Sequence, residues 1–128
     1  MVAERGFDAV LEALWQSEVA SGRVNDAALR ERFFAMCRRC GEDVFVRQTL
    51  AIMARADSRP DLGSLPTPVL LLCGRQDAIT PLEGHEEIAA GAPQARLVVL
   101  EDCGHLSTWE RPQEVTAALR TWLAEDLG

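Results

Sequence analysis

Apolar residues in the N-terminal part of the chain are spaced as in amphipathic helices. Between residues 7 and 15 they recur at i, i+3, i+4, i+7 and i+8, which places them on one helical face. These residues are Phe7, Val10, Leu11, Leu14 and Trp15. Asn25 or Asp26 can cap a second helix that ends at Gly41. A third helix is expected from about 43 to 56, so the pattern predicts an all-helical segment over residues 1–57.

The third predicted helix has an apolar side, which we expect to face inward. This side consists of Phe45, Val46, Thr49, Leu50, Ile52 and Met53. The composition changes after it, because residues 58–68 hold Pro60, Pro66 and Pro68 together with Gly63. Regular helix does not tolerate this density of proline. We therefore expect 58–68 to be a connector between the helical segment and a second unit, residues 69–128.

The second unit alternates strand and helix. The uninterrupted apolar run Val69–Cys73 ends at Gly74 and is typical of a parallel strand covered on both faces. A helix is expected from about 81 to 91, a second strand over 96–100 and a final helix from about 112 to 124. The prediction is a β-α-β-α unit with parallel strands and a right-handed crossover. Two strands with apolar faces need sheet neighbours, so this sheet looks unfinished.

Composition and charge limit the classes of partner. The 128 residues are 48% hydrophobic and 26% charged, with a net charge of -7, as in an ordinary globular domain. This acidic balance provides no basic stripe for phosphates, which argues against nucleic acid. The longest apolar run, Val69–Cys73, is far shorter than the roughly 20 residues that span a bilayer, and no signal-peptide pattern opens the chain. We therefore expect a soluble, cytoplasmic protein with no membrane partner.

The four cysteines are expected to be reduced thiols, because nothing in the sequence indicates secretion. Cys37 and Cys40 form a C-x-x-C pair that could bind a metal ion or cycle as a dithiol. Cys103 and His105 could complete a zinc site with them. However, the pair lies at the end of a predicted helix, where the helix dipole raises the pKa of a thiol. We therefore expect no metal and no cofactor.

Ionisable residues follow both predicted strands. Asp77 lies in the loop 74–81 and His105 in the loop 101–106, at the sheet edge where open α/β folds place their ligands. A carboxylate that accepts a hydrogen bond from imidazole Nδ1 fixes the tautomer and stabilises the imidazolium, as in a Ser-His-Asp triad. We therefore expect Asp77 and His105 to form a hydrogen bond and to take part in catalysis.

These two loops resemble those of the α/β-hydrolase family. Residues 68–81 are similar to the penultimate core strand and its acid loop, and residues 95–112 to the last strand and the histidine loop. The resemblance implies an α/β fold, with residues 69–128 as the C-terminal part of the hydrolase core and residues 1–57 as a helical cap. It implies that Asp77 is the triad acid and His105 the catalytic histidine. Within the family, the sequence of these segments is most similar to those of pimeloyl-carrier-protein methyl esterases and 3-oxoadipate enol-lactonases. This similarity implies a small-molecule ester or related acyl substrate.

The nucleophile of that family is missing from this sequence. The family carries a serine in a Gly-x-Ser-x-Gly elbow. None of the five serines has glycine at both the -2 and +2 positions; they are Ser17, Ser21, Ser58, Ser64 and Ser107. The oxyanion-hole donors, which the family draws from the residue after the nucleophile and from an early strand loop, are absent as well. The sequence therefore resembles the C-terminal portion of a serine hydrolase that begins inside the cap.

Two functional interpretations remain open. In the first, the chain supplies the acid and the base of a hydrolase, and the nucleophile lies on an N-terminal segment of the same gene product or on a separate chain. In the second, the chain is a non-catalytic remnant that associates with itself through its open strand edge. In both cases we expect a homo-oligomer or a partner chain that completes the sheet.

Overall fold

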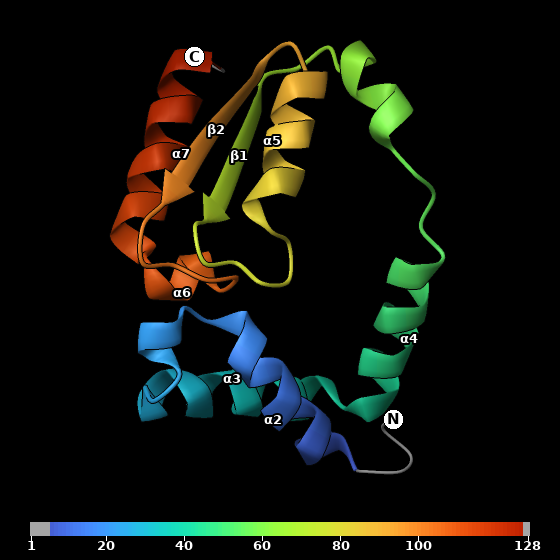
Figure 1. Ribbon diagram of the computed structural model, residues 1–128, viewed down its shortest axis with the longest axis vertical. Coiled ribbons are helices and arrows are strands. Elements are labelled where there is room, and N and C mark those ends of the chain that lie inside the picture. The colour runs from blue at the N-terminus through green and yellow to red at the C-terminus, as the bar shows by residue number, and fades with distance from the viewer. Residues whose placement is uncertain (1–5, 127–128) are drawn as a thin grey trace.

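The N-terminal part of the chain is helical, as its apolar spacing predicts (Figure 1). The computed structural model describes residues 6–126. Its first elements are α2 (Phe7–Glu18), a 3₁₀ helix (Ser21–Arg23), α3 (Ala27–Cys40) and α4 (Glu42–Met53). Of the two cap candidates for α3, Asp26 is the one used, because its carboxylate accepts a hydrogen bond from the Leu29 N–H at 3.0 Å.

Helices α2 and α3 pack around a buried apolar cluster. It consists of Leu11, Trp15, Val19, Leu29, Phe33 and Phe34. The indole N–H of Trp15 donates to the Val24 carbonyl at 2.9 Å, so the buried ring keeps a partner for its polar atom. Leu106 and Trp109, from the far end of the chain, pack against the same cluster. The two halves of the protein therefore share part of their core.

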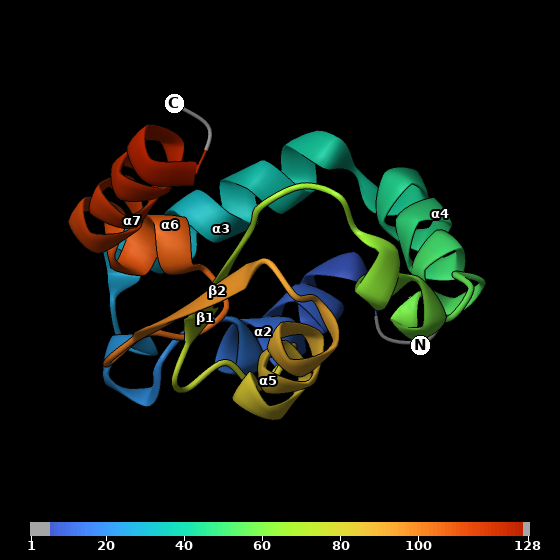
Figure 2. The ribbon, with the colours of Figure 1, turned by 90° about the horizontal axis from the view of Figure 1, so that it is seen from above.

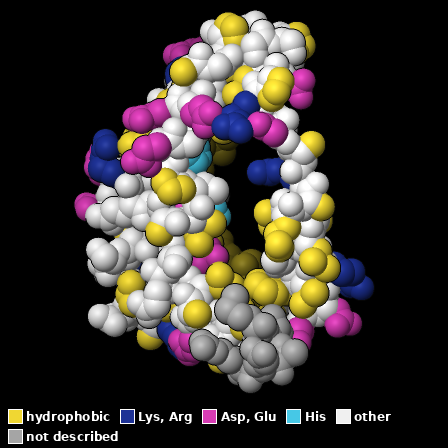
Figure 3. Space-filling view, turned by 45° about the vertical axis from the view of Figure 1, so that its right-hand side comes forward, with side chains coloured by type: hydrophobic (Ala, Val, Ile, Leu, Met, Phe, Trp, Pro, Cys, Tyr) yellow, Lys and Arg dark blue, Asp and Glu magenta, His cyan; other side chains and the backbone are white. Residues whose placement is uncertain are grey.

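The expectation that α4 turns its apolar side inward is wrong. The fractional exposure of Val46, Leu50, Ile52 and Met53 is 38%, 59%, 67% and 77%. Phe45 is an exception, since its ring lies 5.6 Å from that of Phe7. Figure 1 shows α4 standing apart from the sheet, and Figure 3 shows hydrophobic side chains gathered along the opening between them. Periodicity identifies an apolar face, but the rest of the described chain does not cover it.

The connector is more regular than its prolines suggest. Residues Arg59–Ser64 form a 3₁₀ helix with proline in its first turn. Its Leu62 side chain lies close to Gly91, where an added Cβ would come within 2.9 Å of Leu62 Cδ1. The three prolines exclude a long α-helix in this segment. They permit a short 3₁₀ helix, because proline is tolerated in the first turn of a helix.

The second half is the expected β-α-β-α unit. Strands β1 (Val69–Gly74) and β2 (Ala95–Leu100) are parallel, and their pairing runs from Val69 opposite Ala95 to Gly74 opposite Leu100. The remaining elements are α5 (Leu82–Gly91), α6 (Ser107–Glu110) and α7 (Pro112–Asp126). Figure 2 shows α5 and α7 on opposite faces of the sheet. The α/β fold class is therefore confirmed, and the four-residue helix α6 is an addition to the predicted elements.

The described residues form a sheet of only two strands. Most strand residues are half-buried, and full burial is reached only at Cys73, Gly74 and Leu100, where the strands end. The two loops that follow the strands therefore begin at buried residues, whose positions are fixed by packing. Within residues 6–126 there is no helix with both the length and the apolar character needed to cross a membrane.

Candidate functional site

The loop after β1 folds around the carboxylate of Asp77. Oδ1 accepts hydrogen bonds from the backbone N–H groups of Ile79 at 2.9 Å and Thr80 at 2.8 Å. Oδ2 accepts a third from the Thr80 hydroxyl at 2.9 Å. An aspartate side chain that bonds to N–H groups two and three residues ahead is a common way to form a turn. The loop therefore presents Asp77 in a fixed orientation just before α5.

His105, in the loop after β2, meets this carboxylate. Its Nδ1 lies 2.9 Å from Oδ2 of Asp77 and 3.3 Å from the Thr80 hydroxyl. An ionised carboxylate only accepts hydrogen bonds, so Nδ1 carries the proton and donates it. Nε2 is then the nitrogen left to act on a reactant. The His105 side chain is 34% exposed and that of Asp77 only 5%, so the ring lies between the buried carboxylate and the surface.

The expected hydrogen bond between Asp77 and His105 is therefore confirmed, whereas their catalytic roles stay a prediction.

The electrostatics of Asp77 fit an ionised partner for imidazole. Burial by itself would raise the pKa of this carboxyl group. Hydrogen bonds from the Thr80 N–H, from His105 and from the Thr80 hydroxyl outweigh burial, so the pKa lies below its ordinary value. Asp77 is thus a carboxylate at neutral pH.

A second carboxyl group lies near the pair. Glu18 ends helix α2, and its backbone carbonyl accepts a hydrogen bond from the Leu106 N–H at 3.0 Å. Burial raises the pKa of Glu18; the charge of His105 lowers it, and that of Asp77 raises it further. The end of α2 is therefore part of the surroundings of the Asp77–His105 pair.

Three backbone segments meet at this site without room for a side chain between them. A Cβ added to Gly74 would lie 2.3 Å from the Gly104 carbonyl oxygen. A Cβ added to Gly104 would lie 2.5 Å from the Ala20 nitrogen. Glycine permits such an approach because it has no Cβ. The end of β1, the histidine loop and the turn after α2 are thereby held in direct contact.

Sequence reasoning missed the contributions of Thr80 and Glu18 to this site. For Thr80 a signal exists, since an aspartate followed three residues later by threonine matches a turn in which the carboxylate binds the backbone ahead of it. For Glu18 the local sequence holds no signal, because its place near His105 depends on packing between distant parts of the chain.

Two of the four cysteines, Cys73 and Cys103, are buried. Cys37 and Cys40 are free thiols, and burial raises the pKa of Cys37. Burial, and then the charge of Glu110, raise the pKa of Cys103 to about 12, so it is a neutral thiol. Residues 6–126 contain no group of three or more His, Cys, Asp or Glu side chains placed to hold a metal ion.

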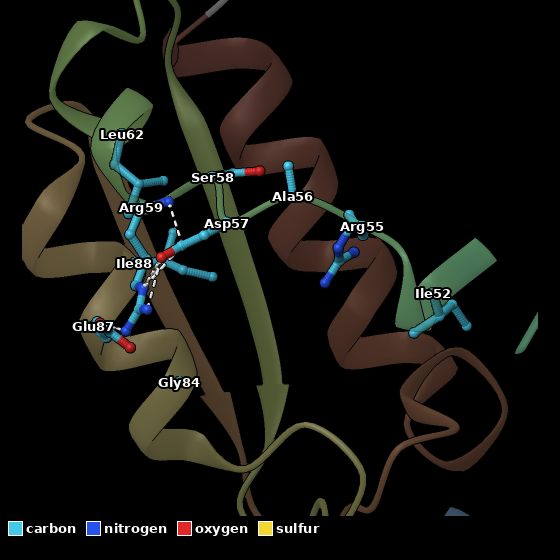
Figure 4. A pocket seen from close by; sticks show the side chains of 10 residues that line it. All are labelled: Ile52, Arg55, Ala56, Asp57, Ser58, Arg59, Leu62, Gly84, Glu87 and Ile88. Carbon is cyan, nitrogen blue, oxygen red and sulfur yellow. Dashed lines mark hydrogen bonds and ion pairs between the residues drawn. The ribbon is translucent and has the colours of Figure 1, made fainter. Parts of the chain in front are cut away.

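A cavity of about 610 Å³ lies away from the Asp77–His105 pair, between the connector and α5 (Figure 4). Its charged lining is largely paired within the chain. Arg59 forms ion pairs with Asp57 at 2.7 Å and with Glu87 at 3.5 Å. Neither Asp77 nor His105 lines this cavity, so it is separate from the hydrogen-bonded pair at the sheet edge.

Comparison with known sequences gives a consistent result. The sequence model of the Alpha/beta hydrolase family matches residues 2–119. A pimeloyl-[acyl-carrier protein] methyl ester esterase of Nitrosomonas europaea is 37% identical over 65 residues, which are 51% of this chain and 26% of that protein. A 2-hydroxy-6-oxononadienedioate/2-hydroxy-6-oxononatrienedioate hydrolase of Dechloromonas aromatica is 35% identical over 77 residues, or 59% and 26% of the two chains. The aligned part is thus about a quarter of each relative.

Solved structures resemble nearly the whole chain. A thermophilic esterase from Thermogutta terrifontis superposes with a TM-score of 0.88 at 31% identity, over 97% of this chain and 46% of that one. The enol-lactonase from Burkholderia xenovorans superposes with a TM-score of 0.87 at 22% identity, over 97% and 47%, and shows likeness of fold alone. This chain therefore spans about half the length of these structures.

Proposed function

Because the chain belongs to the α/β-hydrolase family, we propose that it supplies the acid and the base of a serine hydrolase acting on carboxylic esters. The observation that carries the proposal is the 2.9 Å hydrogen bond between His105 Nδ1 and Asp77 Oδ2. In this role Asp77 orients the imidazole and His105 transfers protons. The serine nucleophile and the oxyanion-hole donors come from a segment outside these 128 residues, which contain no Gly-x-Ser-x-Gly elbow.

The chemistry follows from the tautomer. With Nδ1–H directed at Asp77, Nε2 of His105 takes the proton from the serine hydroxyl as its oxygen attacks the ester carbonyl carbon. The ester C–O bond then breaks as the imidazolium gives this proton to the departing alkoxide. The alkoxide leaves as the alcohol, and the acyl group stays on the serine oxygen. Water repeats the sequence on the acyl-serine and releases the carboxylic acid. Asp77 stays ionised throughout, because its charge stabilises the imidazolium.

Names of the relatives support an ester or related acyl substrate. The Nitrosomonas protein is named a methyl ester esterase, and the Thermogutta structure is that of an esterase. We assign residues 1–57 to a helical cap, 58–68 to a connector and 69–128 to the C-terminal part of the hydrolase core, as the resemblance of the two loop segments to that family implies. The free cysteines fit a reducing cytoplasm.

The test joins the chain to an N-terminal half that bears the elbow, for example that of the Thermogutta esterase, and measures hydrolysis of p-nitrophenyl acetate. We expect activity in the completed protein. Replacing His105→Ala or Asp77→Asn should lower it by about 10²- to 10⁴-fold, because positioned acid-base catalysis is lost. The 128 residues alone should be inactive. The proposal would be contradicted by turnover in the chain alone if that turnover disappears in His105→Ala and if a serine-directed phosphonate labels one of the chain's own serines.

The exposed apolar side of α4 favours a second candidate, a non-catalytic remnant that associates with itself. Light scattering distinguishes the two. A stable homo-oligomer that does not dissociate when the N-terminal half is added favours the remnant. A homo-oligomer that dissociates and forms a one-to-one complex with the added N-terminal half favours the hydrolase.

A further inference from the structure

A buried carboxylate links the histidine loop to the N-terminal helices. Glu110, the last residue of α6, is only 3% exposed. Its Oε1 accepts a hydrogen bond from the Gly104 N–H at 3.0 Å, and its Oε2 accepts one from the Ala20 N–H at 2.9 Å. One side chain therefore satisfies two buried backbone amides that lie far apart in the sequence.

The backbone of Glu110 is held by two further hydrogen bonds. The Glu110 N–H donates to the Leu106 carbonyl at 2.9 Å, and the Arg23 guanidinium donates to the Glu110 carbonyl at 3.4 Å. A buried carboxylate is costly unless its oxygens are hydrogen-bonded, and a buried N–H without a partner is costly as well. The arrangement removes both costs together, so Glu110 and the two amides depend on one another.

The same contacts enclose His105 from both sides. The preceding amide, of Gly104, is held through Glu110, and the following amide, of Leu106, donates to the Glu18 carbonyl at 3.0 Å. Both hydrogen-bond connections end in the segment 18–20, at the end of α2: Glu110 binds the Ala20 N–H, and the Leu106 N–H binds the Glu18 carbonyl. Gly104 also packs directly against that segment, where a Cβ would come within 2.5 Å of the Ala20 nitrogen. The backbone of His105 is thus fixed relative to the N-terminal helices.

We propose that Glu110 is a positioning residue. Through its hydrogen bonds, the orientation of the His105 imidazole depends on the position of the N-terminal helices. The inference rests on the proposed function for its catalytic meaning, although the structural link does not. Displacement of the reacting group by about 1 Å lowers rates by about 100-fold, so a loosened histidine loop affects the chemical step.

The first test uses the 128-residue chain and does not need activity. In Glu110→Gln the single carbonyl oxygen can serve one amide, while its NH₂ group faces the other N–H. We expect amide hydrogen exchange at Ala20 or Gly104 to become at least about tenfold faster. The Nδ1 proton signal of His105 should broaden or disappear. Glu114→Gln, at an exposed glutamate of α7, is the control and should change neither. Unchanged exchange at both amides, with an unchanged His105 signal, would overturn the inference.

The second test uses the completed hydrolase. Glu110→Gln should lower kcat by about 10- to 100-fold and leave KM nearly unchanged, because the chemical step loses its geometry. If wild type depends on His105 and Glu110→Gln keeps full kcat, this inference fails while the proposed function stands. If His105→Ala keeps full activity, the proposed function fails, and the exchange result still decides the structural link.

A variant that does not fold calls for a gentler change. Glu110→Asp keeps the charge and shortens the side chain by one methylene, so it should reach only one of the two amides. Faster exchange at the other amide supports the role of Glu110. Full protection at both Ala20 and Gly104 contradicts it.

Discussion

His105 Nδ1 and Asp77 Oδ2 lie 2.9 Å apart although the two residues follow different strands and are separated by helix α5. Because β1 and β2 are parallel and end side by side, their loops open at the same sheet edge. The hydrogen bond is thus a product of the crossover topology, and changes to the surrounding contacts should affect it in ways that can be measured.

Thr80→Val removes one donor to Asp77 while the backbone N–H of residue 80 remains. The lost hydroxyl bond to Oδ2 should raise the pKa of Asp77 and weaken its hold on His105. We expect the completed hydrolase to lose about 2- to 10-fold in kcat/KM, the value of one modest hydrogen bond. Thr121→Val, at an exposed position of α7, should have no effect. A loss as large as that of Asp77→Asn would show that Thr80 does more than orient the carboxylate.

Stability at low pH should depend on Asp77. Its folded pKa lies below the ordinary 3.8, so the unfolded chain binds more protons in this range. The stabilisation by Asp77 is therefore present above pH 3.8 and is lost as the pH falls through the lowered value. Urea unfolding between pH 2 and pH 6 should show a shallower acid dependence for Asp77→Asn than for wild type. Asp61→Asn, at an exposed site, should keep the wild-type slope.

Glu18 should act in the opposite direction. Burial raises its folded pKa above the ordinary 4.5, so the folded chain binds more protons and loses stability as the pH rises from 4.5 through the raised value. Glu18→Gln removes this effect and keeps the backbone bond to Leu106. We expect the variant to be more stable than wild type at pH 7, with a smaller difference at pH 4, when unfolding is followed by circular dichroism. Glu31→Gln, an exposed change on α3, should give no such gain.

Two glycines provide a matched test of the crowded junction. Gly104→Ala places a Cβ against the Ala20 nitrogen and should destabilise the fold by about 1–3 kcal/mol or more, as overpacking does. Gly84→Ala, in α5, meets nothing within 4 Å and should stabilise it by about 0.4–1 kcal/mol. Denaturant midpoints measure both. Equal midpoints for the two variants would mean that the turn after α2 moves aside freely.

The sequence predicts the strands, most helices and the Asp77–His105 pair, because each leaves a local signal. Val69–Cys73 is an apolar run, and the two ionisable residues follow strands whose parallel pairing brings their ends together. The inward turn of α4 is predicted wrongly, since Leu50 and Met53 show what the helix can bury and not what is present to cover it. Close approaches such as Gly104 to Ala20 depend on packing between remote segments and leave no local pattern.

The pairing of β1 with β2 also determines when this site can form during folding. A slip of one residue would displace one loop along the other by about 3.3 Å and turn its side chains to the opposite face. In the native register, Gly74 lies opposite Leu100, and Asp77 and His105 are in bonding distance. The bond is therefore a reporter of correct strand alignment: a misregistered intermediate would have strands and helices in nearly native amount but no bonded imidazole.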